Sequence, residues 1–335
     1  GLLDEALAIR LRAHGEASIE VAETRDRLAQ VLYKTGALTE AERLARMALA
    51  SRRAAWGDDH PDIARSLNNL AAILQANGER EAAAELFEQA LAQRRRLYGD
   101  RHGAVVQSLS NAATSHATLG EWAEAEKRFA EALETATAVY GEDHIMVADI
   151  LYNSARLHRV RGDVASSLED HRRALDIRRR QLREAHPEII QSLVALGNAL
   201  REIDPAAAEA HYRDALTLQR RHLAADDARR ASTLIRLGRF LCPSEPNEAI
   251  ALLDEAWQLR RRVLGERRWE TALAEGYLGR CLAGVDTERA RARLLAAFEM
   301  LDASVGADDP RAEKVRRWLA DLEAEPPEQA ADGPG

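Results

Sequence analysis

The stretch that decides the fold runs from Gly57 to Ala71 and reads Gly-Asp-Asp-His-Pro-Asp-Ile-Ala-Arg-Ser-Leu-Asn-Asn-Leu-Ala. A glycine at Gly57 stops one helix, and Pro61 stands where the first turn of the next helix needs no free N–H. The same device returns as His186-Pro187 and as Asp309-Pro310. These loops predict a chain of helices joined by short, recurring connections.

The stretch belongs to a repeat with a period of 42 residues, which shortens to 41 toward the C-terminus. Glycine, histidine and small residues each recur at this interval. The glycine positions are Gly15, Gly57, Gly99 and Gly141, and also Gly36, Gly78, Gly120 and Gly162. The histidines are His60, His102, His144 and His186, and one small-residue series is Ala6, Ala48, Ala90, Ala132, Ala174, Ala215, Ala256 and Ala297. Fixed periods of this length indicate a solenoid of stacked units.

Each unit reads as two antiparallel helices that pack at small residues, with a glycine such as Gly36 or Gly120 at the turn between them. The composition, rich in Ala, Leu, Arg and Glu with 4% aromatics, agrees with an all-α fold without a sheet. We expect a right-handed α-α superhelix, with first helices near 19–35, 61–77, 103–119, 145–161, 187–203, 228–242 and 269–284. The predicted boundaries are 1–14 for the second helix of a truncated repeat, 15–56, 57–98, 99–140, 141–182, 183–223, 224–264 and 265–305 for seven repeats, 306–324 for a capping helix and 325–335 for a disordered tail.

At these residues the sequence resembles the tetratricopeptide repeats of kinesin light chains and of related bacterial arrays with 42-residue units. The resemblance is most specific over Gly57–Ala71 and Ala82–Leu91 and weakens in later units, where Arg183 replaces the loop glycine. It implies that the first helix of each pair lines a concave face. It also implies that asparagines on that face hold an extended peptide by its backbone, because an amide both donates and accepts hydrogen bonds.

The predicted peptide-binding groove combines an asparagine ladder with arginines and tyrosines at matching positions of later first helices. Its residues are Asn68, Asn69, Asn111, Tyr152, Asn153, Arg156, Arg159, Asn198, Arg201, Arg236, Arg239, Tyr277 and Arg280. We expect the asparagines to hold a peptide backbone and the arginines to hold acidic side chains. The alternative is that arginine is only the solvated residue that a GC-rich, bacterial genome favours, since Lys34, Lys127 and Lys314 are the only lysines.

The histidine ladder is expected to cap helix starts, because helices 8–10 Å apart cannot share one metal ion between such residues. His158 and His171 occupy packing positions that Leu74 and Phe87 fill in the second unit. We expect a neutral core pair there, with a pH-sensing or ligand role as the alternative.

Three arginine runs, 94–96, 178–180 and 260–262, raise the possibility of a basic stripe for RNA. Their place at helix ends, beside Asp100, Glu184 and Glu266, favours a structural role instead. A net charge of −8 also argues against nucleic-acid binding.

No run of about 18 apolar residues exists, so no membrane partner is expected. Cys242 and Cys281 fit no metal or redox spacing and are expected to be free, buried small residues in a reducing, cytoplasmic compartment.

No catalytic, metal or cofactor motif is present, so the sequence predicts a protein-interaction scaffold and not an enzyme. The alternative is a regulatory segment of a larger signalling protein. Because the chain begins at Gly1 and not at Met, we expect more chain before it. Similar bacterial arrays follow nucleotide-hydrolysing, kinase or caspase-like domains.

Overall fold

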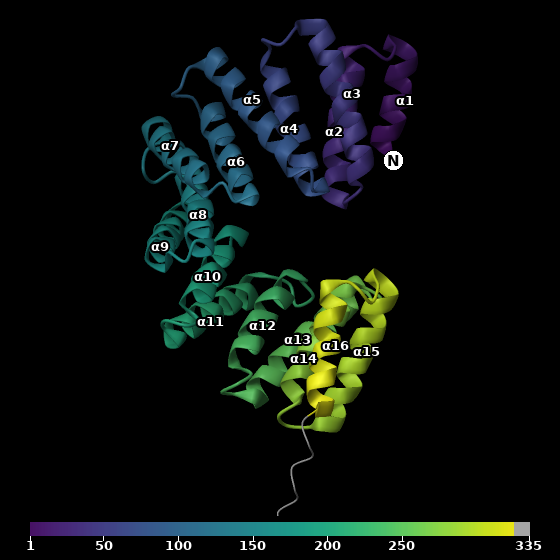
Figure 1. The fold of residues 1–335 in the computed structure, drawn as a ribbon, viewed down its shortest axis with the longest axis vertical. Helices are drawn as coiled ribbons and strands as arrows, with labels where there is room; N and C mark the ends of the chain where they lie inside the picture. Colours follow the sequence, from purple (N-terminus) through teal and green to yellow (C-terminus); the bar gives the residue numbers. More distant parts are fainter. Residues whose placement is uncertain (325–335) are drawn as a thin grey trace, which may run out of the picture. The chain divides into compact units, whose positions relative to one another are not determined.

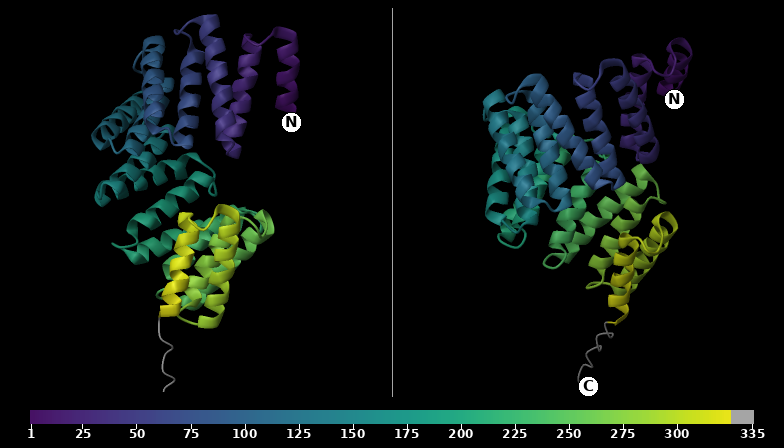
Figure 2. Two further views of the ribbon diagram at one scale, coloured as in Figure 1. Left: turned by 45° about the vertical axis from the view of Figure 1, so that its right-hand side comes forward. Right: turned by 45° about the horizontal axis from the view of Figure 1, so that its top comes forward.

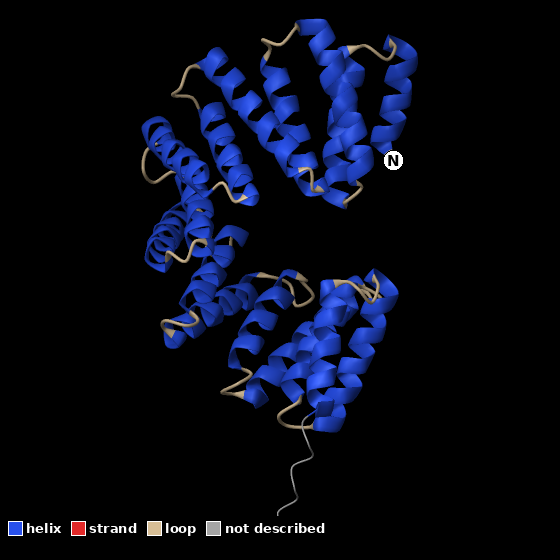
Figure 3. Ribbon diagram, in the orientation of Figure 1, coloured by secondary structure: helices blue, strands red, loops and turns tan. Residues whose placement is uncertain are grey.

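The computed structural model describes residues 1–324, in which all regular structure is helical and no strand occurs (Figures 1 and 3). The predicted all-α fold is therefore confirmed. The chain divides into two compact units between Gln181 and Leu182, one residue before the predicted boundary between the fourth and fifth repeats. The predicted tail, 325–335, lies outside the described residues.

The first unit contains helices that alternate between first and second members of each pair. Their bounds are α1 Leu2–His14, α2 Ile19–Thr35, α3 Leu38–Trp56, α4 Pro61–Asn77, α5 Arg80–Tyr98, α6 Gly103–Leu119, α7 Trp122–Tyr140, α8 Ile145–Val160 and α9 Val164–Gln181. Each helix packs on the next along the chain (Figure 2). The first helices α2 and α4, and likewise α6 and α8, also touch across the stack.

The second unit continues the same pattern with slightly shorter first helices. Its bounds are α10 Pro187–Leu200, α11 Pro205–His222, α12 Arg229–Leu241, α13 Pro246–Leu264, α14 Trp269–Leu282, α15 Thr287–Val305 and α16 Pro310–Ala324. Helix α16 packs on α15 and α14.

The small-residue series lies at the contact between paired helices, as predicted. Every member from Ala48 to Ala297 is fully buried. At Gly197, near the end of α10, a bulky side chain of the paired helix α11 fills the space that a Cβ atom would occupy. A Cβ atom at Gly197 would stand 2.6 Å from the ring of Tyr212. Small residues therefore set the spacing of the helix pairs.

The loops between repeats confirm that the histidine ladder caps helix starts. Nδ1 of each of these histidines accepts a hydrogen bond from the backbone N–H two residues later, at 3.1–3.4 Å. The rings of His60, His102 and His144 also stack on an aromatic residue at the end of the preceding helix, with centroids 3.9–4.4 Å apart. These two contacts fix the path of the chain from one repeat to the next.

The two cysteines are joined in a disulfide, and the expectation of free thiols was wrong. Cys242 directly follows α12, Cys281 lies in α14, and their Cα atoms are 5.7 Å apart. Their separation of 39 residues is close to the local period of 41, so the repeat places them near matching ends of neighbouring first helices. The inference of a reducing compartment from unpaired cysteines therefore loses its basis.

Candidate functional site

The predicted groove residues lie on first helices of both units, and we call their positions in each unit the first-helix face. In the first unit they lie on α4, α6 and α8, and in the second unit on α10, α12 and α14, with Arg201 directly after α10. The asparagines and tyrosines are half-buried, whereas the six arginines are exposed. The repeat produces this pattern because one period returns each position to the same side of the next first helix.

The asparagine ladder of the first unit connects neighbouring first helices. Asn111 on α6 donates a hydrogen bond from Nδ2 to Oδ1 of Asn68 on α4, at 2.6 Å. Asn69 on α4 donates from Nδ2 to Oδ1 of Asp26 on α2, at 3.3 Å. Asn69 and Asn111 each keep a second N–H and a side-chain oxygen for which the described residues offer no partner. Each of the two amides can therefore still bond to a peptide group.

A buried ion pair behind Asn69 shows that this asparagine also supports the stack. Asp26 lies 3.2 Å from Nη1 of Arg52 on α3, and both side chains are almost fully buried. The same Nη1 donates to the hydroxyl of Ser66 on α4. The sequence analysis did not predict this network, because the position of Asp26 carries a carboxylate in only one repeat.

The ladder ends in a small pocket of about 170 Å³ that residues of α6, α7 and α8 line. Asn153, Arg156 and Arg159 line it together with apolar and hydroxyl side chains from Thr114 to Phe129. Tyr152 is not among the residues that line this pocket. Its ring centre lies 5.3 Å from that of His171, and the guanidinium of Arg178 lies over it. The structure thus brings three of the four predicted α8 residues to one opening.

In the second unit the predicted residues form a chain of contacts across three helices. Arg236 on α12 donates to Oδ1 of Asn198 on α10 at 3.4 Å, and the same oxygen accepts from the hydroxyl of Tyr212 at 2.9 Å. The guanidinium of Arg239 lies 4.4 Å from the ring centre of Tyr277 on α14. Polar side chains therefore follow one another along this face as well.

The arginines of this face carry positive charge that no carboxylate neutralises. Within residues 1–324, none of Arg156, Arg159, Arg201, Arg236, Arg239 and Arg280 forms an ion pair. Three of these charges act on the phenol of Tyr212. Burial raises the pKa of this phenol, and the charges of Arg201, Arg236 and Arg239 oppose that rise. The face is accordingly a cationic surface.

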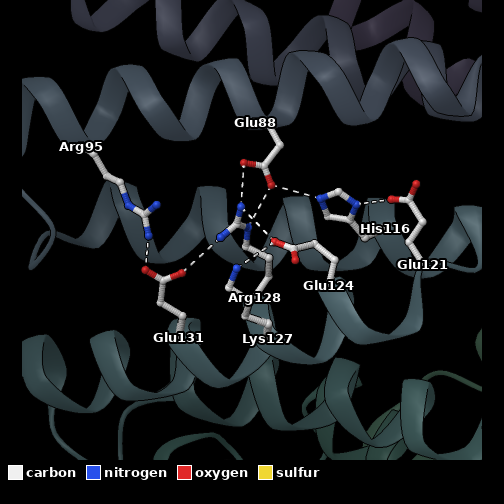
Figure 4. A network of polar contacts seen from close by, with 8 residues as sticks. All are labelled: Glu88, Arg95, His116, Glu121, Glu124, Lys127, Arg128 and Glu131. Atoms are coloured by element: carbon white, nitrogen blue, oxygen red, sulfur yellow. Dashed lines mark hydrogen bonds and ion pairs between the residues drawn. The ribbon is translucent and has the colours of Figure 1, made fainter.

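On several second helices, in contrast, arginines take part in ion-pair networks with carboxylates. Figure 4 shows such a network, in which Arg128 on α7 lies 2.9 Å from Glu88 on α5 and also contacts Glu124 and Glu131. His116 on α6 lies between two carboxylates, 3.1 Å from Glu88 and 2.5 Å from Glu121.

Two opposing effects act on the pKa of His116. Burial alone would lower it, but the hydrogen bonds to Glu121 and Glu88 raise it above its usual value. The network therefore joins three helices through charge. Sequence reasoning did not single it out, since its members come from distant positions of two repeats.

Several arginines of the three runs contact neighbouring parts of the stack. In two runs the first arginine contacts the next first helix: Arg94 donates to the hydroxyl of Ser108 at 2.9 Å, and Arg260 donates to the carbonyl of Glu270 at 2.7 Å. The second arginine of these runs is paired with a carboxylate, Arg95 with Asp100 and Arg261 with Glu266. In the run 178–180, Arg178 pairs with Asp149 on α8 and Arg180 pairs with Asp143. Glu184 instead pairs with Arg221 and His222.

His158 and His171 have different neighbours. The ring nitrogens of His158 lie 3.8 Å from Asp163 and 3.6 Å from Asp170. His171 is 1% exposed, and its Nδ1 has no hydrogen-bond partner in the described part of the chain. Burial, reinforced by the charges of Arg159, Arg178 and Arg156, lowers the pKa of His171 to about 4.

Across residues 1–324 no helix is both long and apolar enough to span a bilayer. The same range contains no grouping of three histidine, cysteine or acidic side chains with metal-binding geometry.

Two models of the tetratricopeptide repeat match the sequence. One matches residues 62–138, 105–159 and 146–221, and the other matches 21–62 and 230–270. Together the matches extend over 21–221 and 230–270, well over half of the chain. No protein with a curated function matches the sequence.

Solved structures with the same fold include BtubC (BKLC) from P. vanneervenii. It is 26% identical, with a TM-score of 0.56, over 66% of this chain and 92% of that one. A Podosopora anserina protein described as a kinesin light chain with nearly identical TPR-like repeats is 21% identical, with a TM-score of 0.51, over 60% and 97% of the two chains.

A signal transduction ATPase with a tetratricopeptide repeat sensor, from Pyrococcus horikoshii, is 14% identical with a TM-score of 0.65. The match extends over 96% of this chain and 49% of that one, so this chain corresponds to about half of the ATPase. At these identities, the second and third likenesses show a shared fold alone.

Proposed function

The chain belongs to the tetratricopeptide-repeat family, and from this premise we propose that its first-helix face binds an extended, acidic segment of a partner protein. The proposal gives the chain the role of a protein-interaction scaffold and assigns it no reaction. A cytoplasmic location stays a prediction.

The observation that carries the proposal is a set of six exposed arginines on the first-helix face, none of which has a carboxylate partner within residues 1–324. Other arginines of the chain are already paired, as Arg213 on α11 is with Glu209 and Glu248 at 2.6 and 2.7 Å. The six arginines of the first-helix face have no such partner among residues 1–324. Since each of these residues is exposed, a ligand carboxylate gains a bidentate partner without displacing an internal carboxylate.

The asparagine ladder supports an extended ligand in particular. Asn68, Asn111 and Asn153 stand on successive first helices, and each is half-buried with amide groups available on the face. An amide pairs with a backbone N–H or C=O whatever the side chain of the ligand is, so the ladder favours capture of a main chain. Charge would then select acidic sequences.

The test is selection of linear peptides by display on the full chain, followed by calorimetry on a selected peptide. The variant Asn111→Ala/Asn153→Ala removes two amide contacts worth about 1 kcal/mol each, so we expect affinity to fall about 30-fold or more. Asn77→Ala is the matched control, because Asn77 is an exposed asparagine at the end of α4 that bonds to Glu42 and Glu79. Unchanged affinity in the double variant, with helix content retained, would contradict the proposal.

A second candidate is a sensor segment within a larger signalling protein, with the solenoid reporting occupancy to a nucleotide-hydrolysing, kinase or caspase-like domain. The fold shared with the sensor-bearing Pyrococcus horikoshii ATPase favours it. The encoding gene upstream of Gly1 decides between the two: an enzymatic domain there supports the sensor, and an unrelated reading frame supports the scaffold.

A further inference from the structure

We propose that the Cys242–Cys281 disulfide is a thiol-exchange site, recognised and opened by a low-molecular-weight thiol that carries a carboxylate. The pocket shares Arg239, Tyr277 and Arg280 with the first-helix face, but the proposed chemical step takes place at sulfur and needs no bound partner segment.

The disulfide forms part of the wall of a pocket of about 560 Å³. Residues from α12, α13, α14 and α16 line this pocket, among them Leu253, Tyr277 and Trp318. Its volume is in the range of small-molecule sites. Cys242 is half-buried and Cys281 is 3% exposed, so Cys242 is the more exposed residue of the pair. A small thiol can therefore approach this bond from the pocket.

The charge in the pocket selects the kind of thiol. Arg239 and Arg280 line it, three residues before Cys242 and directly before Cys281, and no acidic residue is among the lining side chains. Neither arginine has a carboxylate partner within residues 1–324. A carboxylate on the incoming thiol therefore meets two unneutralised guanidinium groups.

The same two charges assist the chemistry. The thiolate R–S⁻ attacks Sγ of Cys242; the new S–S bond forms as the old one breaks, and Cys281 leaves as a thiolate with the electron pair. Nearby cations stabilise a departing thiolate, which speeds exchange. A second R–S⁻ then attacks the external sulfur of the mixed disulfide and releases R–S–S–R, and Cys242 leaves as a thiolate. The two protein thiolates take up two protons, so the disulfide is reduced by two electrons that two thiols supply.

The experiment measures the second-order rate of disulfide opening in the full chain, by alkylation of the released thiols and intact-mass analysis. 3-Mercaptopropionate and the neutral 2-mercaptoethanol are compared at equal thiolate concentration. We expect the carboxylate thiol to react about fivefold to tenfold faster at low salt, with the advantage shrinking at 1 M salt. A mixed disulfide with Cys242 should appear as a transient adduct.

Two variants locate the effect. Arg239→Gln/Arg280→Gln should abolish the preference, whereas Arg267→Gln should keep it. Arg267 is also exposed and has no ion pair within residues 1–324. It precedes α14, whose first residue, Trp269, is about 16 Å along the helix from Arg280 at the pocket. Equal rates for the two thiols, or a preference that survives in the double variant, would overturn the proposal. So would two free thiols in the air-oxidised protein.

Discussion

His171 is the residue whose protonation should cost the first unit most as pH falls. Its side chain is 1% exposed, Tyr152 covers it at 5.3 Å, and three arginine charges act on it. Its pKa is about 4 in the folded chain, against 6.5 for an unperturbed histidine. Between these values the unfolded chain binds a proton that the folded chain does not, so stability decreases as pH falls through this window.

The size of the effect follows from the two pKa values. A difference of about 2.5 units corresponds to at most about 3.4 kcal/mol, and about 2 kcal/mol of it is lost by pH 5. The variant His171→Phe removes the titrating group and installs the residue found at the matching positions Phe87 and Phe129. Relative to this variant, the wild-type chain should lose about 2 kcal/mol between pH 7 and pH 5.

Urea unfolding, followed by circular dichroism at both pH values, measures this difference. Carboxylates also titrate over the range, but they are common to both proteins and cancel in the comparison. His14→Gln is the control, because His14 is exposed at the end of α1 and should leave the pH dependence unchanged. A stability difference between wild type and His171→Phe that is the same at pH 7 and pH 5 would refute the reasoning.

Three further predictions concern stability. Asp26→Ala leaves Arg52 buried without its counter-charge and should cost about 3–5 kcal/mol in urea unfolding, whereas a cost below 1 kcal/mol would rule out a buried pair. Gly197→Ala forces a Cβ against the ring of Tyr212 and should cost about 1–3 kcal/mol by the same measurement; a neutral result would mean that the helices are farther apart. His116→Gln should destabilise the chain at pH 6. Because the folded pKa of His116 is raised, the loss should fade as pH rises above that value in thermal melts, and a pH-independent loss would contradict the charged state.

The helix pairs could be predicted from the sequence because their determinants recur. The recurring glycine, histidine and proline residues predict first helices over 61–77 and 103–119. Helices α4 and α6 have these bounds in the structure. Helix α10 ends at Leu200, three residues before its predicted end at 203, for a local reason. Pro205 begins α11, and the Asp204 side chain accepts from the N–H of Ala207, so the chain must leave the helix earlier.

Features that occur in a single repeat could not be predicted in this way. The Asp26–Arg52 pair joins α2 to α3, and the disulfide joins the residue after α12 to α14; neither arrangement recurs within the part of the chain that the structure describes. Recognising them requires the register between neighbouring helices to within one residue. The first-helix face could be predicted in part. The repeat indicated which positions belong to it, but only the structure shows that no acidic side chain within residues 1–324 pairs with its arginines.

The most direct measurement compares a display-selected peptide with a copy in which every Asp and Glu is replaced by Asn and Gln. Each is titrated calorimetrically into the wild-type chain and into a variant with Arg156, Arg159, Arg201, Arg236, Arg239 and Arg280 changed to Gln. If these arginines hold the carboxylates of the peptide, the wild-type chain should bind the neutral copy at least tenfold more weakly than the acidic peptide, a difference of about 1.4 kcal/mol. The variant should bind the two peptides with equal affinity. Equal affinity of both peptides for the wild-type chain would contradict the assignment of this face.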